Sequence, residues 1–66
     1  MNESVGKRIR DRRKELKMTQ ETLAKASNIS RGTIAAIESG KCKDVLVSTL
    51  TALAIALDTT VESFLP

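Results

Sequence analysis

The side chains of this sequence that are able to do covalent or acid–base chemistry are few. Its 66 residues include one cysteine and no histidine, tyrosine or tryptophan. A single cysteine cannot form an internal disulfide, and without histidine neither the usual zinc site nor the usual proton shuttle near neutral pH is available. We therefore expect no catalytic residue, no metal site and no cofactor.

The one cysteine, Cys42, lies between two lysines, Lys41 and Lys43. Their positive charges favour the thiolate, which is the reactive form, so a redox-sensitive thiol is one interpretation. An ordinary loop residue is the other interpretation. We prefer the second, because nothing else in the sequence indicates redox sensing.

The charged residues are distributed unevenly along the chain. Residues 1–43 contain all eleven Lys and Arg residues and five of the eight Asp and Glu residues, which gives a net charge of +6. Residues 44–66 contain no base and three acids, which gives −3. A basic surface that faces a polyanion explains this asymmetry, and a basic surface that is merely solvated explains it equally well.

Hydrophobic periodicity predicts five short helices. The first runs from about residue 4 to 17, the second from 20 to 27 and the third from 31 to 39, the fourth begins after Ser48, and the fifth is a last turn over 61–65. Thr19, Ser30 and Ser48 are the predicted N-caps, and Asn28 and Gly40 are the predicted left-handed ends of the second and third helices. Residues 41–47 show no period and are predicted to form a loop.

These elements predict one compact all-α domain over residues 1–66. Leu23, Ile29, Ile34 and Ile37 form the predicted wedge between the second and third helices, and the fourth helix, apolar almost all round, is the predicted buried centre. No stretch approaches the roughly 20 apolar residues of a membrane span, and no signal-peptide core follows the basic N-terminus. We expect a cytoplasmic protein without membrane contact.

Motifs along the chain carry a family resemblance. They are Met18-Thr19-Gln20-Glu21-Thr22-Leu23-Ala24, Asn28-Ile29-Ser30, Ile37-Glu38-Ser39-Gly40-Lys41 and Leu53-Ala54-Ile55-Ala56-Leu57. With these residues the chain resembles the lambda Cro/cI repressor class of helix-turn-helix proteins, also called the XRE family, over nearly its whole length. The resemblance implies a five-helix lambda-repressor-like DNA-binding domain whose second and third helices form the helix-turn-helix. Lys17 and Asn28 stand where the family often has glycine, and Arg12 and Ser27 stand where it is more often apolar.

In this family the third helix enters the major groove of DNA with its N-terminal residues against the base edges. Carried over to this chain, the resemblance implies base-reading and phosphate-binding residues. The base readers are Arg31, Gly32, Thr33, Ala36 and Gln20, and the phosphate-binding residues are Lys41, Lys43, Arg10, Thr19 and Ser30. Arg31 can give two hydrogen bonds to guanine. The alternatives are an unspecific phosphate contact for Arg31, an ordinary exposed side chain for Gln20 and no role for Gly32.

Arg13 and Glu38 each flank the apolar stripe of a helix, four residues after Ile9 and Ile34 respectively. A partly buried charge requires a partner. In the family the matching Arg and Glu pair across the first and third helices, so the resemblance implies a structural ion pair here. By helical angle Arg12 faces the stripe at least as well, so the choice of Arg13 comes from the resemblance.

The predicted function is a transcriptional regulator, in the form of a repressor, that binds double-stranded DNA sequence-specifically. Because one small module contacts little DNA, we expect a homodimer on a roughly palindromic operator. The candidate interface residues are Leu46, Val47, Val61, Phe64 and Leu65, with core packing as the alternative for each.

The biological context stays open at this point. Phage repressors, restriction-modification controllers and toxin–antitoxin regulators all fit, and no small-molecule effector is evident. The alternative function is a helical protein-interaction module that titrates a partner without binding DNA. A nucleic-acid-modifying enzyme is the third and weakest class, because the sequence has no nucleophile or metal-ligand cluster.

Overall fold

The computed structural model describes residues 4–65 and is all-α over that range. Its elements are α1 (Val5–Glu15), α2 (Gln20–Ser27), α3 (Arg31–Ser39), α4 (Val47–Ala56) and a 3₁₀ turn, η1 (Val61–Phe64). The bounds of α2 and α3 are those predicted, whereas α1 is shorter at both ends. None of the helices between residues 4 and 65 is long and apolar enough to cross a membrane.

The prediction of a fifth α-helix was wrong, because the residues in question form only the 3₁₀ turn η1. Its hydrogen bonds join residues three apart, from Ser63 N to Thr60 O at 3.2 Å and from Leu65 N to Glu62 O at 3.1 Å. Leu65 then adopts an extended conformation with φ −87° and ψ 143°. Four residues are a typical length for a 3₁₀ helix, which packs one side chain inward before the chain straightens.

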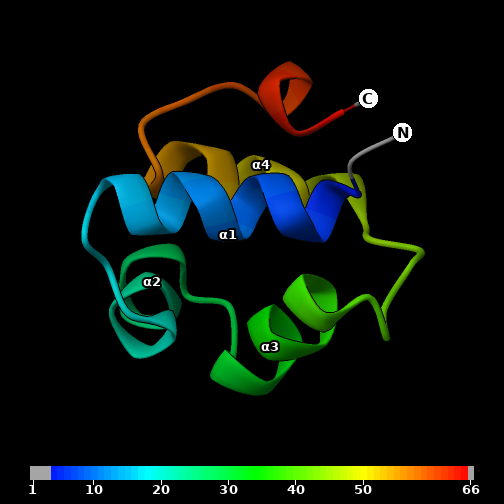
Figure 1. Ribbon diagram of the computed structural model, residues 1–66, viewed down its shortest axis with the longest axis horizontal. Coiled ribbons are helices and arrows are strands. Elements are labelled where there is room, and N and C mark those ends of the chain that lie inside the picture. The colour runs from blue at the N-terminus through cyan, green and yellow to red at the C-terminus, as the bar shows by residue number, and fades with distance from the viewer. Residues whose placement is uncertain (1–3, 66) are drawn as a thin grey trace.

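The helices are arranged around α1, which crosses the middle of the molecule (Figure 1). In that view α4 and η1 lie on one side of α1, and α2 and α3 lie on the other. Close contacts join α1 with α3 and η1, and α2 with α3 and α4. The first helix therefore packs against α3 on one side and η1 on the other, while α4 packs against α2 and η1.

The first three α-helices have a serine or threonine N-cap at their start, whereas the start of the fourth is fixed by apolar packing. Ser4, Thr19 and Ser30 accept hydrogen bonds from the backbone N–H three residues on. The prediction that Ser48 caps α4 was wrong: the N-cap is Leu46, which makes no side-chain cap bond. Val45 packs against the core just before Leu46, and such an apolar residue fixes where a helix enters without a polar cap.

The left-handed residues fall at the ends of helices. Asn28 (φ 61°) and Gly40 (φ 86°) end α2 and α3 as predicted. Lys17 (φ 57°) and Asp58 (φ 54°) adopt the same conformation after α1 and α4. An L-residue with a side chain is strained in this region, so each of the three non-glycine positions has a cost in conformational energy.

The core lies between α1, the helix-turn-helix and α4. Its buried apolar residues are Ile9, Leu23, Ile34, Ile37, Leu50, Leu53, Ala54, Leu57 and Phe64. Ser27 is also buried, and its hydroxyl donates to Leu23 O at 2.7 Å, which satisfies its polar atom. The expectation that α4 is buried all round was wrong on one face, because Ile55 is 75% exposed.

Gly6 sets how closely α1 approaches α3. Gly6 is the second residue of α1 and is buried. A Cβ built there would collide with the backbone carbonyl oxygen of Ile37 and would lie 3.0 Å from Glu38 Cα. Backbone atoms cannot rotate away as a flexible side chain can. The distance between the first and third helices therefore requires glycine at this position.

We predict that Gly6→Ala destabilises the protein by at least about 2 kcal/mol, because the added methyl group must push α1 away from α3. Urea unfolding measures the loss. The matched control is Gly32→Ala, where the added Cβ meets nothing within 4 Å, and a gain of up to about 1 kcal/mol is expected from helix propensity. Equal stabilities of the two variants would contradict the close approach.

Candidate nucleic-acid interface

The N-terminal end of α3 is exposed and carries a positive charge. Arg31, Gly32 and Thr33 all lie at the surface. The Ser30 hydroxyl accepts a hydrogen bond from Thr33 N at 3.1 Å and donates one to Thr33 Oγ1 at 2.8 Å, which fixes the first turn. The Arg31 side chain makes no hydrogen bond or ion pair within residues 4–65. Its guanidinium is available to a ligand from outside the chain.

The rest of the outward side of α3 is made of small residues. Gly32 is exposed, and Ala35, Ala36 and Ser39 are half-buried or exposed. Ala36 O accepts from Cys42 N at 3.0 Å, which ties the following segment to the end of the helix. Arg31 is thus the one long side chain among the predicted readers on α3.

An ion pair holds α3 against α1. Arg13 Nε donates to Glu38 Oε2 at 2.8 Å and Nη2 donates to Oε1 at 3.0 Å, while Nη1 donates to Met18 O at 2.8 Å. The two side chains retain 11% and 5% of their exposure. One planar guanidinium therefore joins α1, α3 and the turn that leads into α2, a fork geometry that lysine cannot reproduce.

The hydrogen bonds to Glu38 raise the pKa of Arg13 above its ordinary value, against the opposing effect of burial. A raised pKa in the folded state contributes stability below the pKa of the unfolded chain. That contribution is lost only as the pH rises through the folded value, far above neutrality. This ion pair is a constant support over the neutral range, and no pH switch acts through Arg13.

Gln20, the predicted reader at the start of α2, is half-buried in the same cluster. Its Nε2 donates to Glu38 Oε1 at 3.1 Å. A carboxylate only accepts hydrogen bonds, so the amide nitrogen must face Glu38, and the carbonyl oxygen and the second N–H remain for another partner. Gln20 is therefore neither a plain exposed side chain nor fully available to DNA.

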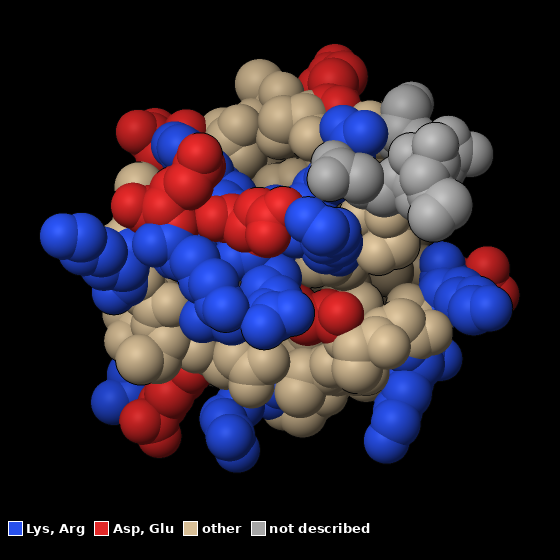
Figure 2. Space-filling view, viewed as in Figure 1, with Lys and Arg blue, Asp and Glu red and all other residues tan. Residues whose placement is uncertain are grey.

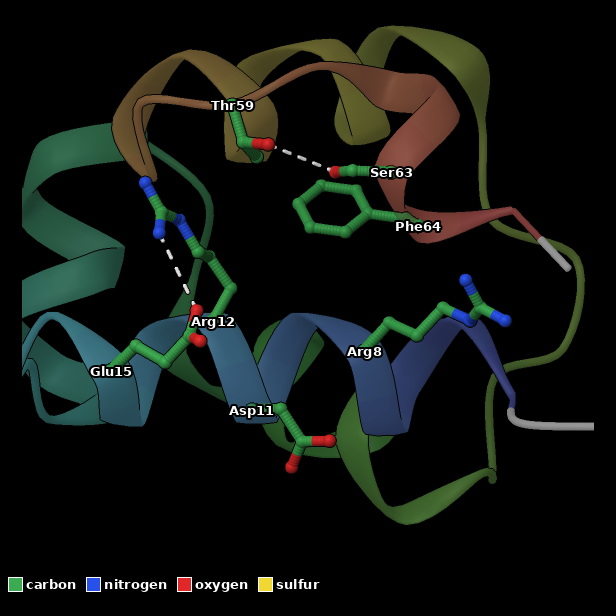
Figure 3. A pocket seen from close by; sticks show the side chains of 7 residues that line it. All are labelled: Arg8, Asp11, Arg12, Glu15, Thr59, Ser63 and Phe64. Carbon is green, nitrogen blue, oxygen red and sulfur yellow. Dashed lines mark hydrogen bonds and ion pairs between the residues drawn. The ribbon is translucent and has the colours of Figure 1, made fainter.

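Arg12 has a structural role that the sequence left open. Its Nε donates to Leu57 O at 2.9 Å and its Nη2 to Asp58 O at 3.2 Å, so it closes the C-terminal end of α4. Figure 3 shows Arg12 reaching from α1 toward that end, with Phe64 between α1 and η1. The neighbouring arginines thus bind opposite parts of the fold: Arg13 the third helix, and Arg12 the fourth.

The predicted phosphate-binding residues lie in two kinds of place. Lys41 and Lys43 are exposed after α3, and Arg10 is exposed on α1. The hydroxyls of Thr19 and Ser30 are occupied as N-caps. Figure 2 shows Lys and Arg side chains gathered over α1 across the middle of one face, and others projecting below α2 and α3.

Sequence reasoning did not place Lys17 among the site residues. It lines a hollow of about 590 Å³ together with Arg31, Gln20 and Thr19. Lys17 and Arg31 line the same hollow because of the way the turn before α2 folds back toward α3. No local sequence pattern reveals this arrangement.

The predicted interface residues divide into exposed and buried ones. Leu46 and Val47 are 69% and 73% exposed and Leu65 is 44% exposed, whereas Val61 is half-buried against the core. Phe64 is 1% exposed, so its assignment to an interface was wrong, and its alternative as a core residue is the outcome. Ile55 was missed, although it belongs to the exposed apolar residues of α4.

Cys42 is half-buried and packs against the core, with Sγ 4.0 Å from Asp44 O. Among residues 4–65 no group of three His, Cys, Asp or Glu residues lies close enough to hold a metal ion. The side chains that this surface offers to a ligand are the lysines and arginines around α3 and the turn before α2.

Comparison with known proteins places these features in a family. A family model described as helix-turn-helix matches residues 9–64. The chain belongs to the helix-turn-helix family. This agrees with the resemblance of the sequence to the Cro/cI class. Among curated proteins, none matches the chain.

Two solved structures are similar to this helix-turn-helix protein. The restriction-modification controller protein C.AhdI from Aeromonas hydrophila has a TM-score of 0.86 and 32% identity, over 91% of this chain and 89% of that chain. The master regulator for biofilm formation SinR, in complex with DNA, has a TM-score of 0.91 and 24% identity, over 94% of this chain and 98% of that chain. The second likeness is one of fold alone.

We predict that Glu38→Ala costs about 3–5 kcal/mol of stability, because it leaves the Arg13 guanidinium buried without its carboxylate. Replacing Arg13 and Glu38 together by methionine removes both charges and is expected to cost less. Denaturant unfolding compares the variants. Asp11→Ala is the control, because it breaks the exposed Lys7–Asp11 pair, and little change is expected. A loss from Glu38→Ala no larger than the control's would contradict the bracing role.

Proposed function

We propose that this protein is a transcriptional repressor that binds double-stranded DNA sequence-specifically, as a homodimer on a roughly palindromic operator in the cytoplasm. The observation that carries the proposal is the unpartnered Arg31 guanidinium at the exposed start of α3, among residues 4–65. Membership of the helix-turn-helix family supports it. The similar structures support it as well, because one is a restriction-modification controller protein and the other is a regulator in complex with DNA.

The third helix is the element that enters the major groove in this proposal. Arg31 donates two hydrogen bonds to O6 and N7 of a guanine, which is worth roughly 1–3 kcal/mol of discrimination against another base. Gly32 lets the helix end approach the bases closely, and the methyl groups of Thr33 and Ala36 suit contact with thymine. Gln20 offers its free carbonyl oxygen and second N–H to a base edge or a phosphate beside the start of α2.

Exposed cations around this helix bind the phosphates. Lys41 and Lys43 follow the C-terminal end of α3, the end farther from Arg31, and Arg10 lies on α1, which packs against α3. Thr19 and Ser30 hold the helix starts in place as caps, because their hydroxyls already have partners. Each phosphate that is neutralised steepens the loss of affinity with the logarithm of salt concentration by about 0.9.

We predict that Arg31→Ala relaxes the base preference at one position of each half-site, whereas Lys41→Ala weakens binding to all duplexes alike. Selection from a random duplex library, followed by binding measurements on single-base variants, distinguishes the two effects. An equal loss on every sequence from Arg31→Ala would reject the reading role. A wild-type protein that binds no duplex at all would favour the protein-interaction alternative.

The fourth helix supplies the proposed dimer interface. No charged residue lies between Val45 and Leu57, although 29% of the chain is charged. Val47, Thr51 and Ile55 are four residues apart and all exposed, so they lie along one side of α4, with exposed Leu46 at its start. An uncharged, largely apolar helix face is typical of a surface that a partner covers. Leu65 extends the candidate interface, and Ile55 takes the place of Phe64.

We predict that Ile55→Lys shifts the protein from dimer to monomer, because two copies would bury like charges against each other. Sedimentation equilibrium at micromolar concentration measures the change. Leu16→Lys is the control, since Leu16 is also exposed and apolar, at 39%, but lies at the end of α1. A wild type that is monomeric and binds one half-site as tightly as the palindrome would refute the dimer.

A further inference from the structure

Lys17 occupies a backbone conformation that is unfavourable for lysine. Its φ of 57° lies in the left-handed region, where glycine is relaxed and an L-side chain is strained. Two backbone hydrogen bonds nevertheless fix the turn. Lys17 N donates to Lys14 O at 3.0 Å, and Met18 N donates to Arg13 O at 3.0 Å. The position is therefore one where glycine would give a more stable fold and where the lysine is retained at a conformational cost.

The fold gains nothing visible from the Lys17 side chain in return. Lys17 is exposed, and within residues 4–65 its ammonium group has no hydrogen bond and no ion pair. Lys7 has a carboxylate partner at 2.9 Å, and Arg12 and Arg13 each hold backbone or side-chain acceptors. A strained residue whose side chain does not serve the fold points to a use outside it.

The location of Lys17 indicates what that use is. Its side chain shares a hollow with the Arg31 side chain, and Arg13 binds Met18 O at 2.8 Å, which ties the turn to α3 through Glu38. Glu21 is the carboxylate that lines the same hollow, so two exposed cations face one anion there and Arg13 is already paired. The hollow is therefore suited to a second anion, and a backbone phosphate of DNA is an anion that lies next to a base edge.

We propose that Lys17 is a phosphate-binding residue of the DNA interface, which contacts the backbone phosphate adjoining the base that Arg31 reads. The inference rests on the proposed function. It adds a residue that the sequence left outside the site, and it explains why lysine stands at a left-handed position. The contact is to phosphate, so it is independent of base sequence.

The test sets stability against affinity. Lys17→Gly relieves the strained backbone and removes the charge, so we expect a higher urea midpoint together with about fivefold weaker binding to a random-sequence duplex. The slope of log affinity against log salt should fall in size by about 0.9 per copy bound. Lys17→Arg keeps both the charge and the strain, and should retain the wild-type affinity and slope.

Asp58→Gly is the matched control for strain relief. Asp58 has φ 54° just after α4 and is not among the residues that line the hollow of Lys17 and Arg31, and its carbonyl bond to Arg12 is a backbone contact that the variant keeps. It should gain stability without losing DNA affinity. If Lys17→Gly binds the duplex with wild-type affinity and slope, this inference is overturned while the proposed function stands. If the wild type binds neither the random duplex nor a selected one, the proposed function is overturned and the inference with it.

Discussion

The geometry of this domain depends on the three acceptors of the Arg13 guanidinium. Glu38 receives two of its hydrogen bonds and the carbonyl of Met18 receives the third. In this way a single side chain of α1 sets the position of α3 and of the turn that carries Lys17. Gln20 joins the cluster through the remaining capacity of the same carboxylate. The buried charges are costly, and they are tolerated because each of the three guanidinium nitrogens of Arg13 donates a hydrogen bond of 2.8 to 3.0 Å.

Much of the fold could be predicted because the decisive signals are local. The caps Thr19 and Ser30 and the left-handed residues Asn28 and Gly40 bound α2 and α3, and their positions in the sequence give the helix ends directly. The start of α4 could not be predicted in the same way. It is determined by the packing of Val45 on the core, and a nearby serine gave a false cap signal.

The parts of the candidate site that escaped prediction involve residues far apart in the chain. The requirement for glycine at position 6 arises from the backbone of α3, 31 residues away at Ile37. The sequence could not decide between Arg12 and Arg13 because both arginines face inward and each has its own partner. Arg12 binds the carbonyl of Leu57, and Arg13 binds Glu38. Phe64 was misassigned because it is buried by the packing of η1 against α1 and α4, which its own short segment does not reveal. Figure 3 shows its side chain between α1 and η1.

The adjacent arginines of α1 have a consequence for the proposed dimer on DNA. Arg12 fastens α1 to the end of α4, and Arg13 fastens the same helix to α3. If two copies pair through α4, the path from one recognition helix to the other passes only through packed helices and contains no flexible linker. In such a dimer the distance between the two copies of α3 is then fixed by the packing of the helices. An operator whose half-sites are a base pair too far apart would have to be accommodated by bending or twisting of the duplex, and the energy of that distortion would be part of how the protein selects its targets.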